Sequence, residues 1–434
     1  MHQRSPKYSQ NSGLTKSNET IRRLSERAEA GLIFRIALIG AGVYGRTLAC
    51  QLTRVPGLKL ACICDRDLRR AYELRTEAGI GAADCLVTDA FVGVREAAPD
   101  LIVDCTGSPA AGARIARIAC ELPAHLIMVN AEADACIGPE IATRLESRGK
   151  VYSLADGDQP SLAVGLADWA AEIGLSVVTA GKWTDAWKQE TAAELEASWH
   201  DAGRTVSDTD RMFLDGTKAN IELACIANCL GFVPDRPGMH GPSYALADIP
   251  EYLRTGVPSA ILSRTGVVDY INCVGVPREQ VHPGGVFVVV QSDNAAGMEV
   301  MARKGNIVSD DYTHMLLYRP FHLLGVETLR SITRALLFGQ PTAAPKMRAV
   351  DVVAVTKKAL AAGHVLAGPG HDVRGEIHAA PDVEAESFVP VGIAAGAVLR
   401  CDVEAGVRLR HDMVRLDADD PAVMLRTDAE ARTT

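Results

Sequence analysis

The segment 33–45, IFRIALIGAGVYG, constrains the fold of this chain more than any other. An apolar run leads directly into a G-x-G-x-x-G turn, which is typical of a strand entering the first helix of a dinucleotide-binding unit. Gly40 permits the tight turn, Gly42 lets a pyrophosphate approach the backbone, and Gly45 lets the helix pack on the strand. The free N–H groups at the start of that helix attract an anion.

A carboxylate follows at the spacing expected for a ribose contact. A second apolar run, 58–64, ends at Asp65, about 20–25 residues after the glycine turn. A carboxylate there binds ribose hydroxyls and repels a 2′-phosphate, which favours NAD, whereas Arg66 could hold the phosphate of NADP. The predicted cofactor is therefore NAD or NADP, with NAD favoured. Val43 and Tyr44, at the start of the helix, belong to the same predicted contact surface.

Strands and helices alternate over the first third of the chain, which predicts an α/β fold with a Rossmann-type, doubly wound parallel sheet. Ligands bind at the carboxyl ends of the strands in such sheets. Thr106, Gly107 and Asn130 stand at such ends and are predicted to contact the cofactor. The strands are expected at 33–39, 58–64, 101–105, 125–130 and 151–154.

Composition excludes several classes of protein. The net charge of −9 offers no basic surface for nucleic acid, and no apolar stretch is long enough to span a membrane. The first residues lack the apolar run of a signal peptide. Eleven cysteines without a C-x-x-C pair favour free thiols in a reducing compartment, so a cytoplasmic location is expected.

At 434 residues the chain is expected to form more than one domain. An α+β region follows the predicted Rossmann domain, and a β-rich module with glycine at its turns follows that. The predicted divisions are a disordered tail at 1–17, a Rossmann domain at 18–155, a second domain at 156–348, a small β-rich domain at 349–416 and a flexible tail at 417–434.

Several long motifs together resemble the homoserine dehydrogenase-like oxidoreductases that carry a C-terminal SAF domain, among them the 1-deoxy-D-xylulose-5-phosphate reductoisomerase-like enzymes. The similarity extends from about residue 20 to about residue 415. The motifs are 127–139, 152–161, 215–218, Glu222, Asn228, 238–242, 266–270 and 318–323.

The resemblance implies a homodimer that transfers hydride reversibly between NAD(P) and a small polyol, sugar acid or sugar phosphate such as 1-deoxy-D-xylulose 5-phosphate, with an isomeroreductase as one form. The resemblance also implies that 156–348 is a homoserine dehydrogenase-like catalytic and dimerisation domain and that the 349–416 module is SAF-like. One departure concerns the substrate: residues 181–187 read GKWTDAW where the reductoisomerase-like enzymes have GKGKNNP. A lysine and two asparagines are lost there, which weakens the case for a phosphate-bearing substrate.

Four residues of the second domain are the catalytic candidates. Lys218, at the start of an amphipathic helix over 217–230, is expected to donate a proton through a depressed pKa, and Glu222 lies one turn further on the same face. Lys182 is expected at the end of a strand over 175–181, as a cation facing the crevice. His240 lies in a glycine-flanked loop and is expected to contact substrate.

Four carboxylates follow predicted strands and are candidates for binding substrate hydroxyls or a divalent cation. Glu132, Asp156 and Asp158 are predicted substrate contacts. Glu132 and Asp134 are the metal candidates, with helix capping as the alternative for Asp134.

Two tryptophans, Trp183 and Trp187, are expected to line the substrate pocket. Two other functions compete with the one described. A homoserine dehydrogenase-type enzyme would fit the fold, but the lysine expected after Asn130 is absent. A non-catalytic SAF-domain protein that senses a dinucleotide would need no convergent polar set in its second domain.

Overall fold

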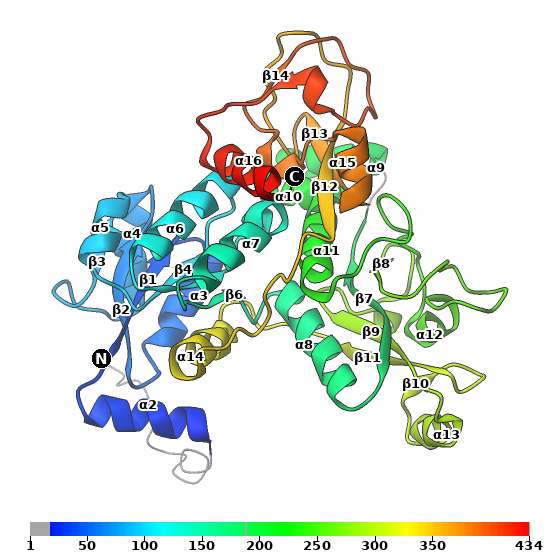
Figure 1. The fold of residues 1–434 in the computed structure, drawn as a ribbon, viewed down its shortest axis with the longest axis horizontal. Helices are drawn as coiled ribbons and strands as arrows, with labels where there is room; N and C mark the ends of the chain where they lie inside the picture. The colour runs from blue at the N-terminus through cyan, green and yellow to red at the C-terminus, as the bar shows by residue number, and fades with distance from the viewer. Residues whose placement is uncertain (1–17, 187–188, 434) are drawn as a thin grey trace.

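The computed structural model describes residues 18–186 and 189–433, which form three parts. Figure 1 shows a parallel sheet on the left, a second sheet at the lower right and a β-rich module at the top, with helices α7 and α11 between them. The predicted tail at 1–17 and Trp187 lie outside the described residues. None of the described helices is long and apolar enough to cross a membrane.

The first sheet is parallel, with strand order β3-β2-β1-β4-β5-β6. This is the strand order of the Rossmann fold, so the predicted fold class is confirmed. Helices cover both faces, which explains why the strands are continuous apolar runs. The strands are β1 Phe34–Ile39, β2 Leu58–Cys64, β3 Leu86–Thr88, β4 Leu101–Asp104, β5 His125–Met128 and β6 Tyr152–Leu154.

The helices of this part include one from far along the chain. Asn18 caps α2, since its side chain accepts a hydrogen bond from the N–H of Ile21. Helix α14, Thr328–Phe338, packs on the Rossmann sheet although the sequence assigned it to the second domain; Ile332 and Ala335 are buried there. The other helices are α2 Glu19–Glu29, α3 Val43–Leu52, α4 Leu68–Glu77, α5 Phe91–Glu96, α6 Pro109–Glu121 and α7 Ala131–Glu146.

The second sheet is mixed, with order β10-β11-β9-β7-β8. Helices α8 and α11 pack on one face, and an aromatic-rich core lies on the other. The strands are β7 Ser176–Thr184, β8 Val267–Asn272, β9 Val286–Gln291, β10 Ile307–Val308 and β11 His314–Arg319. The helices are α8 Gln159–Glu172, α9 Gln189–Asp201, α10 Asp208–Leu214, α11 Thr217–Leu230, α12 Ile249–Tyr252 and α13 Ala295–Arg303.

The C-terminal module packs on α11, and Asn228 fixes its entry because its side-chain oxygen accepts from the N–H groups of Ala349 and Val350. Within the module, Val365 and Val398 form an isolated bridge. The elements of the C-terminal module are β12 Val350–Thr356, β13 Val373–Ala379, α15 Ala380–Glu386, β14 Val398–Leu399 and β15 Val414–Arg415.

The predicted flexible tail after 417 instead contains a docked helix. Helix α16, Pro421–Thr433, packs against α6 and α7. Its Arg426 is buried and donates from Nη1 to Asp351 Oδ1 of β12 at 2.7 Å. A buried, paired arginine fixes the helix to both the Rossmann domain and the C-terminal module.

Candidate active site

The three glycines of the turn have distinct environments. Gly40 has φ +102°, and a Cβ there would lie 2.6 Å from the carbonyl oxygen of Cys105. A Cβ on Gly45 would lie 2.1 Å from the carbonyl oxygen of Gly40, so helix and strand touch at this point. A Cβ on Gly42, the N-cap of α3, meets no atom within 4 Å. Packing requires a glycine at positions 40 and 45. At position 42 the absence of a side chain leaves the space that a pyrophosphate needs.

The side chains next to the turn differ in exposure. Val43 is 76% exposed. Tyr44 points back into the protein, where its hydroxyl lies 2.7 Å from Thr328 Oγ1 and 3.2 Å from the carbonyl oxygen of Asp156. Tyr44 therefore fastens the first turn of α3 to α14, and any cofactor contact from this residue comes from its backbone.

The carboxylate after β2 lies at the glycine turn. Asp65 Oδ2 accepts from the N–H of Ala41 at 2.6 Å, and Oδ1 accepts from the N–H of Asp67 at 2.8 Å. The neighbouring Arg66 is exposed. Asp65 therefore lies beside the glycine turn, and its contact with a ribose stays a prediction.

Replacing Asp65 with asparagine is expected to raise the preference for NADP over NAD by roughly tenfold, because it removes a charge that repels a 2′-phosphate while keeping an acceptor for Ala41. The ratio of the two dissociation constants, titrated by cofactor fluorescence, measures the change. Asp67→Asn, a carboxylate two residues away that caps α4, is the control and should leave the ratio unchanged. An unchanged ratio in the Asp65 variant would mean that this carboxylate does not face the ribose.

A polar network closes the other side of the predicted cofactor crevice. Asp104 Oδ1 accepts from both the N–H and the hydroxyl of Thr106, at 2.8 and 2.6 Å. The amide nitrogen of Asn130 lies 2.9 Å from Thr106 Oγ1, and its oxygen caps α7 through Ala133. Burial raises the pKa of Asp104 to about 6. The network holds the loop so that Gly107 stands exposed with open space beside it.

Two lysines and two glutamates meet where α11 lies between the Rossmann domain and the second sheet. Lys182 forms an ion pair with Glu222. Lys218 Nζ lies 2.7 Å from Glu132 Oε1 and 3.8 Å from Glu222 Oε1. All four side chains are buried or nearly so, and Lys182 is only 1% exposed. These residues, the lysine cluster, bring together four of the predicted site residues.

The charges within the lysine cluster set its protonation. Burial disfavours the charged form of Lys218, but the carboxylates of Glu132 and Glu222 outweigh it, and the pKa of Lys218 is raised. Burial likewise opposes ionisation of Glu222, yet Lys182 and Lys218 lower its pKa. The expected depressed pKa of Lys218 is therefore wrong, because Glu132 and Asp158, which add to the effect of Glu222, come from distant parts of the sequence. Lys218 is a fixed cation.

Asp158 is the titratable neighbour of this cluster. It precedes α8, and its Oδ1 accepts from the N–H of Gln159 at 3.0 Å. Burial, followed by the charge of Glu222, raises the pKa of Asp158 to about 6, against the opposing effect of Lys218 and Lys182. Asp158 can therefore exchange a proton close to neutral pH, whereas the raised pKa of Lys218 keeps that lysine protonated there.

Two predicted substrate contacts lie elsewhere. Asp156 is committed to structure, since its carboxylate accepts from Ser161 at 2.5 Å and from Arg330 at 2.7 Å. Trp183 follows Lys182 in β7, and consecutive side chains of a strand point to opposite faces. Trp183 is accordingly 0% exposed in the core on the far face, with Phe287 as a ring neighbour.

The metal candidates do not converge. Glu132 and Asp134 are two residues apart on α7, so their side chains leave the helix on different sides. Glu132 binds Lys218, whereas Asp134 accepts from the hydroxyl of Tyr152 at 2.5 Å in the core. Asn130, not Asp134, caps the helix. Within residues 18–186 and 189–433, no group of three or more histidine, cysteine, aspartate or glutamate side chains could hold a metal ion.

His240 is also separate from the lysine cluster. Its Nε2 lies 2.8 Å from Asp235 Oδ2, and its backbone N–H donates to Asp269 at 3.0 Å. These contacts commit the ring to a turn. His322, which was not among the predicted site residues, lies closer to the lysine cluster, because it contributes to lowering the pKa of Glu222. Its Nδ1 is 2.7 Å from the carbonyl oxygen of Gly284. Its place in the 318–323 motif was the signal in the sequence.

A cleft of about 190 Å³ opens beside Glu132. The loop Gly107–Pro109 forms one wall, α10 and α11 contribute Met212 and Ile221, and the C-terminal module supplies another wall that includes Val391. His371 Nε2 and Asp208 Oδ1, both lining residues, are 2.9 Å apart. The cleft therefore borders the loop predicted to contact the cofactor and the C-terminal module, and Glu132 is the member of the lysine cluster that lines it.

Comparisons with known proteins agree with this interpretation of the second domain. Residues 157–328 match the family model "Oxidoreductase DRL, catalytic domain". No curated protein matches the chain.

Solved structures with a similar chain course include a hyperthermophilic archaeal homoserine dehydrogenase in complex with NADPH, with 14% identity, a TM-score of 0.40 and coverage of 70% of this chain and 98% of that one. A probable dehydrogenase from Thermotoga maritima has 12% identity, a TM-score of 0.39 and coverage of 71% and 90%. A dihydrodipicolinate reductase from Paenisporosarcina sp. TG-14 has 11% identity, a TM-score of 0.35 and coverage of 70% and 93%. The Rossmann sheet, its glycine turn and the catalytic-domain match lead to one conclusion: the chain is an NAD(P)-dependent oxidoreductase.

Proposed function

We propose that the protein transfers hydride reversibly between NAD(P) and a carbon–oxygen centre of a small polar substrate held in the cleft beside Glu132. The observation that carries the proposal is the lysine cluster, in which two buried ammonium groups share Glu222 at the junction of the two domains. Buried charges are costly and mark sites where function requires them. NAD is favoured over NADP because of Asp65.

Different residues of the chain stabilise the charge on the substrate oxygen and transfer its proton. A bound nicotinamide supplies or accepts the hydride. Lys218 and Lys182 stabilise the negative charge that forms on the carbonyl oxygen when hydride reaches its carbon, and a positioned cation is most effective in a water-excluded site. Asp158 delivers the proton to that oxygen, and takes it back in the oxidative direction. Glu132 and Glu222 hold the ammonium groups in place.

The substrate class rests on the resemblance to SAF-domain oxidoreductases and on the donors present. Lysines interleaved with carboxylates suit a hydroxyl-bearing substrate, such as a polyol, a sugar acid or a sugar phosphate. An isomeroreductase belongs to the same proposal, as do a homodimer, a cytoplasmic location and a SAF-like identity for the 349–416 module. The C-terminal module would enclose the substrate, since it lines the cleft.

The lysine cluster also bears on the two alternatives. A dinucleotide sensor would gain nothing from two buried lysines beside its cofactor crevice. A homoserine dehydrogenase-type activity uses the same hydride chemistry, so only the identity of the substrate distinguishes it from the proposed function. The test is nicotinamide absorbance with NAD and NADP over a panel of 1-deoxy-D-xylulose 5-phosphate, homoserine, branched sugar acids and polyol phosphates. Cofactor binding without turnover of any hydroxyl or carbonyl substrate would support the sensor.

The pH dependence of turnover should report Asp158. Because the pKa of Asp158 is raised to about 6, carbonyl reduction, which needs the protonated acid, should slow as pH rises through about 6. Oxidation, which needs the carboxylate, should accelerate over the same interval. Asp158→Asn keeps the cap of α8 and should remove this limb of the profile, with turnover about 10²-fold lower.

The control for this profile is Asp156→Asn, which changes a nearby carboxylate that is bound to Arg330. It should retain the wild-type limb if the enzyme folds, as checked by thermal melting. A limb that persists in Asp158→Asn would assign the proton to another group.

A further inference from the structure

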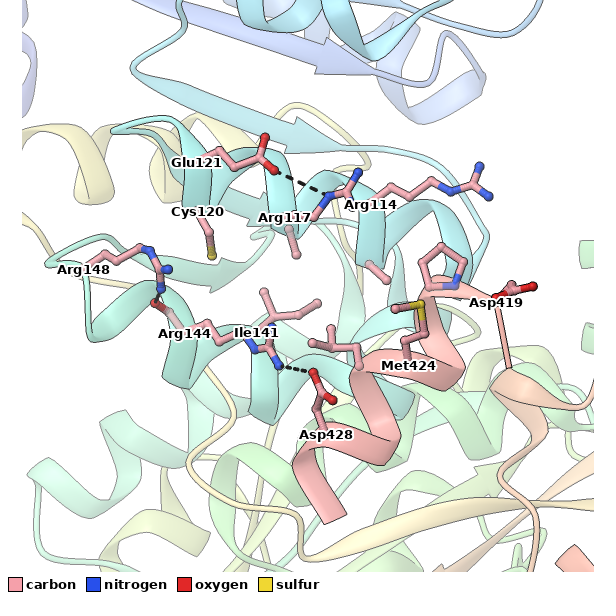
Figure 2. A pocket seen from close by; sticks show the side chains of 14 residues that line it. Arg114, Arg117, Cys120, Glu121, Ile141, Arg144, Arg148, Asp419, Met424 and Asp428 are labelled. Carbon is pink, nitrogen blue, oxygen red and sulfur yellow. Dashed lines mark hydrogen bonds and ion pairs between the residues drawn. The ribbon is translucent and has the colours of Figure 1, made fainter. Parts of the chain in front are cut away.

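A second cavity, of about 420 Å³, lies between α6, α7 and α16 (Figure 2). None of its lining residues belongs to the lysine cluster or to the cleft beside Glu132. It exists because α16 docks on the Rossmann domain. Arg144 of α7 pairs with Asp428 of α16 at 3.1 Å, and the buried Arg426 holds α16 from the other side.

The floor of this cavity is apolar. Ala113 and Ala116 of α6 face it, together with Ile141 of α7 and Leu425 of α16. The two alanines have short side chains, so space remains beside them that larger side chains would have filled. Met424 also lines the cavity and is 55% exposed, an unusual state for a long apolar side chain. The space suits an apolar group.

Cations predominate at the rim. Four arginines line the cavity, against the three carboxylates of Glu121, Asp419 and Asp428. Glu121 is shared by two arginines, Arg95 with Nε at 3.1 Å and the rim residue Arg117 with Nε at 3.6 Å, so its charge is largely compensated. Figure 2 shows Arg148 and Arg144 at one end of the cavity and Arg117 along its upper edge.

The pKa of the Cys120 thiol indicates which charges act at this end of the cavity. Burial raises the pKa of Cys120, and Arg148 and Arg144 act against that rise. Arg148 Nη1 donates only to the carbonyl oxygen of Arg144, at 3.1 Å, among the contacts of the described residues, so it forms no ion pair there. A negative head group placed near Cys120 would meet this guanidinium, and Arg117, whose partner Glu121 is also bound by Arg95, lines the same cavity.

We propose that this cavity is a second ligand site, which binds a small amphiphilic carboxylate. Its apolar chain lies on the floor formed by Ala113, Ala116 and Leu425, and its carboxylate pairs with Arg148 and Arg117. Because α16 forms one wall, the bound ligand stabilises the docked position of that helix.

The probe for this site is octanoate, titrated into the full-length protein by calorimetry and followed by thermal melting. Octanoate should bind saturably and raise the melting temperature. Acetate, which lacks the chain, and octylammonium, which carries the opposite charge, should do neither. Saturable binding of octylammonium at equal affinity, or none of octanoate, would overturn the proposal.

Variants separate this site from general surface binding. Arg117→Gln/Arg148→Gln should weaken octanoate roughly tenfold, the effect of losing charge-assisted hydrogen bonds, and both arginines are exposed, so folding should persist. Ala116→Leu should abolish binding by filling the floor. Arg303→Gln, at an exposed arginine of α13, is the matched control. Equal affinity in the control and the double variant would overturn the proposal.

Discussion

Lys218→Met is expected to lower turnover about 10²–10⁴-fold while leaving cofactor affinity unchanged. The raised pKa of Lys218 makes it a fixed cation, and the variant would remove that charge from the place where oxyanion charge forms. Methionine keeps most of the volume of the side chain. Steady-state kinetics on whichever panel substrate responds would measure the loss, and titration of the cofactor would show that the crevice is intact.

The matched control is Lys357→Met. Lys357 pairs with Asp215 at 2.9 Å and is partly buried, but it belongs to the C-terminal module and stands outside the lysine cluster. Its loss should cost stability without a comparable loss of turnover. Near-native turnover in Lys218→Met would show that this lysine serves only to neutralise Glu132, and the proposed mechanism would be wrong.

The Rossmann part of the fold could be predicted because its signals are local. A strand buried on both faces is an apolar run, and the glycine turn fixes the start of the helix after it. Strand β3 has only three residues, and Leu86 within it is 39% exposed, so no pattern marks it. Helices α14 and α16 were misplaced for another reason: both are held by partners distant in sequence, such as Asp351 for Arg426, and no local pattern reveals such a partner.

The candidate site was predictable only in part. The i, i+4 spacing of Lys218 and Glu222 places both on one face of α11, and that pairing is present. The contact between Lys218 and Glu132 spans two domains, and it reverses the expected direction of the lysine pKa. Trp183 was misplaced because the predicted strand stopped at 181. Strand β7 continues to Thr184, and alternation along it sets Lys182 and Trp183 on opposite faces.

Gly42→Val is expected to abolish binding of NAD and NADP while the protein remains folded. Gly42 has φ −74°, which any residue adopts, and a Cβ there meets no atom of the protein within 4 Å. The added side chain therefore clashes only with a ligand that approaches the start of α3 from outside, and that is the predicted position of the pyrophosphate. Fluorescence titration of the reduced cofactor measures binding, and thermal melting measures folding.

Two further glycine variants make this prediction specific. Gly165→Val, in open space on α8, should keep cofactor affinity, because nothing places a ligand there. Gly45→Val should instead unfold or strongly destabilise the protein, since its Cβ would lie 2.1 Å from the carbonyl oxygen of Gly40. Loss of binding with folding intact at Gly42 alone would locate the pyrophosphate at this turn. Unchanged affinity in Gly42→Val would show that the pyrophosphate does not bind at this turn. A dinucleotide bound as in other Rossmann domains must place its pyrophosphate against this backbone.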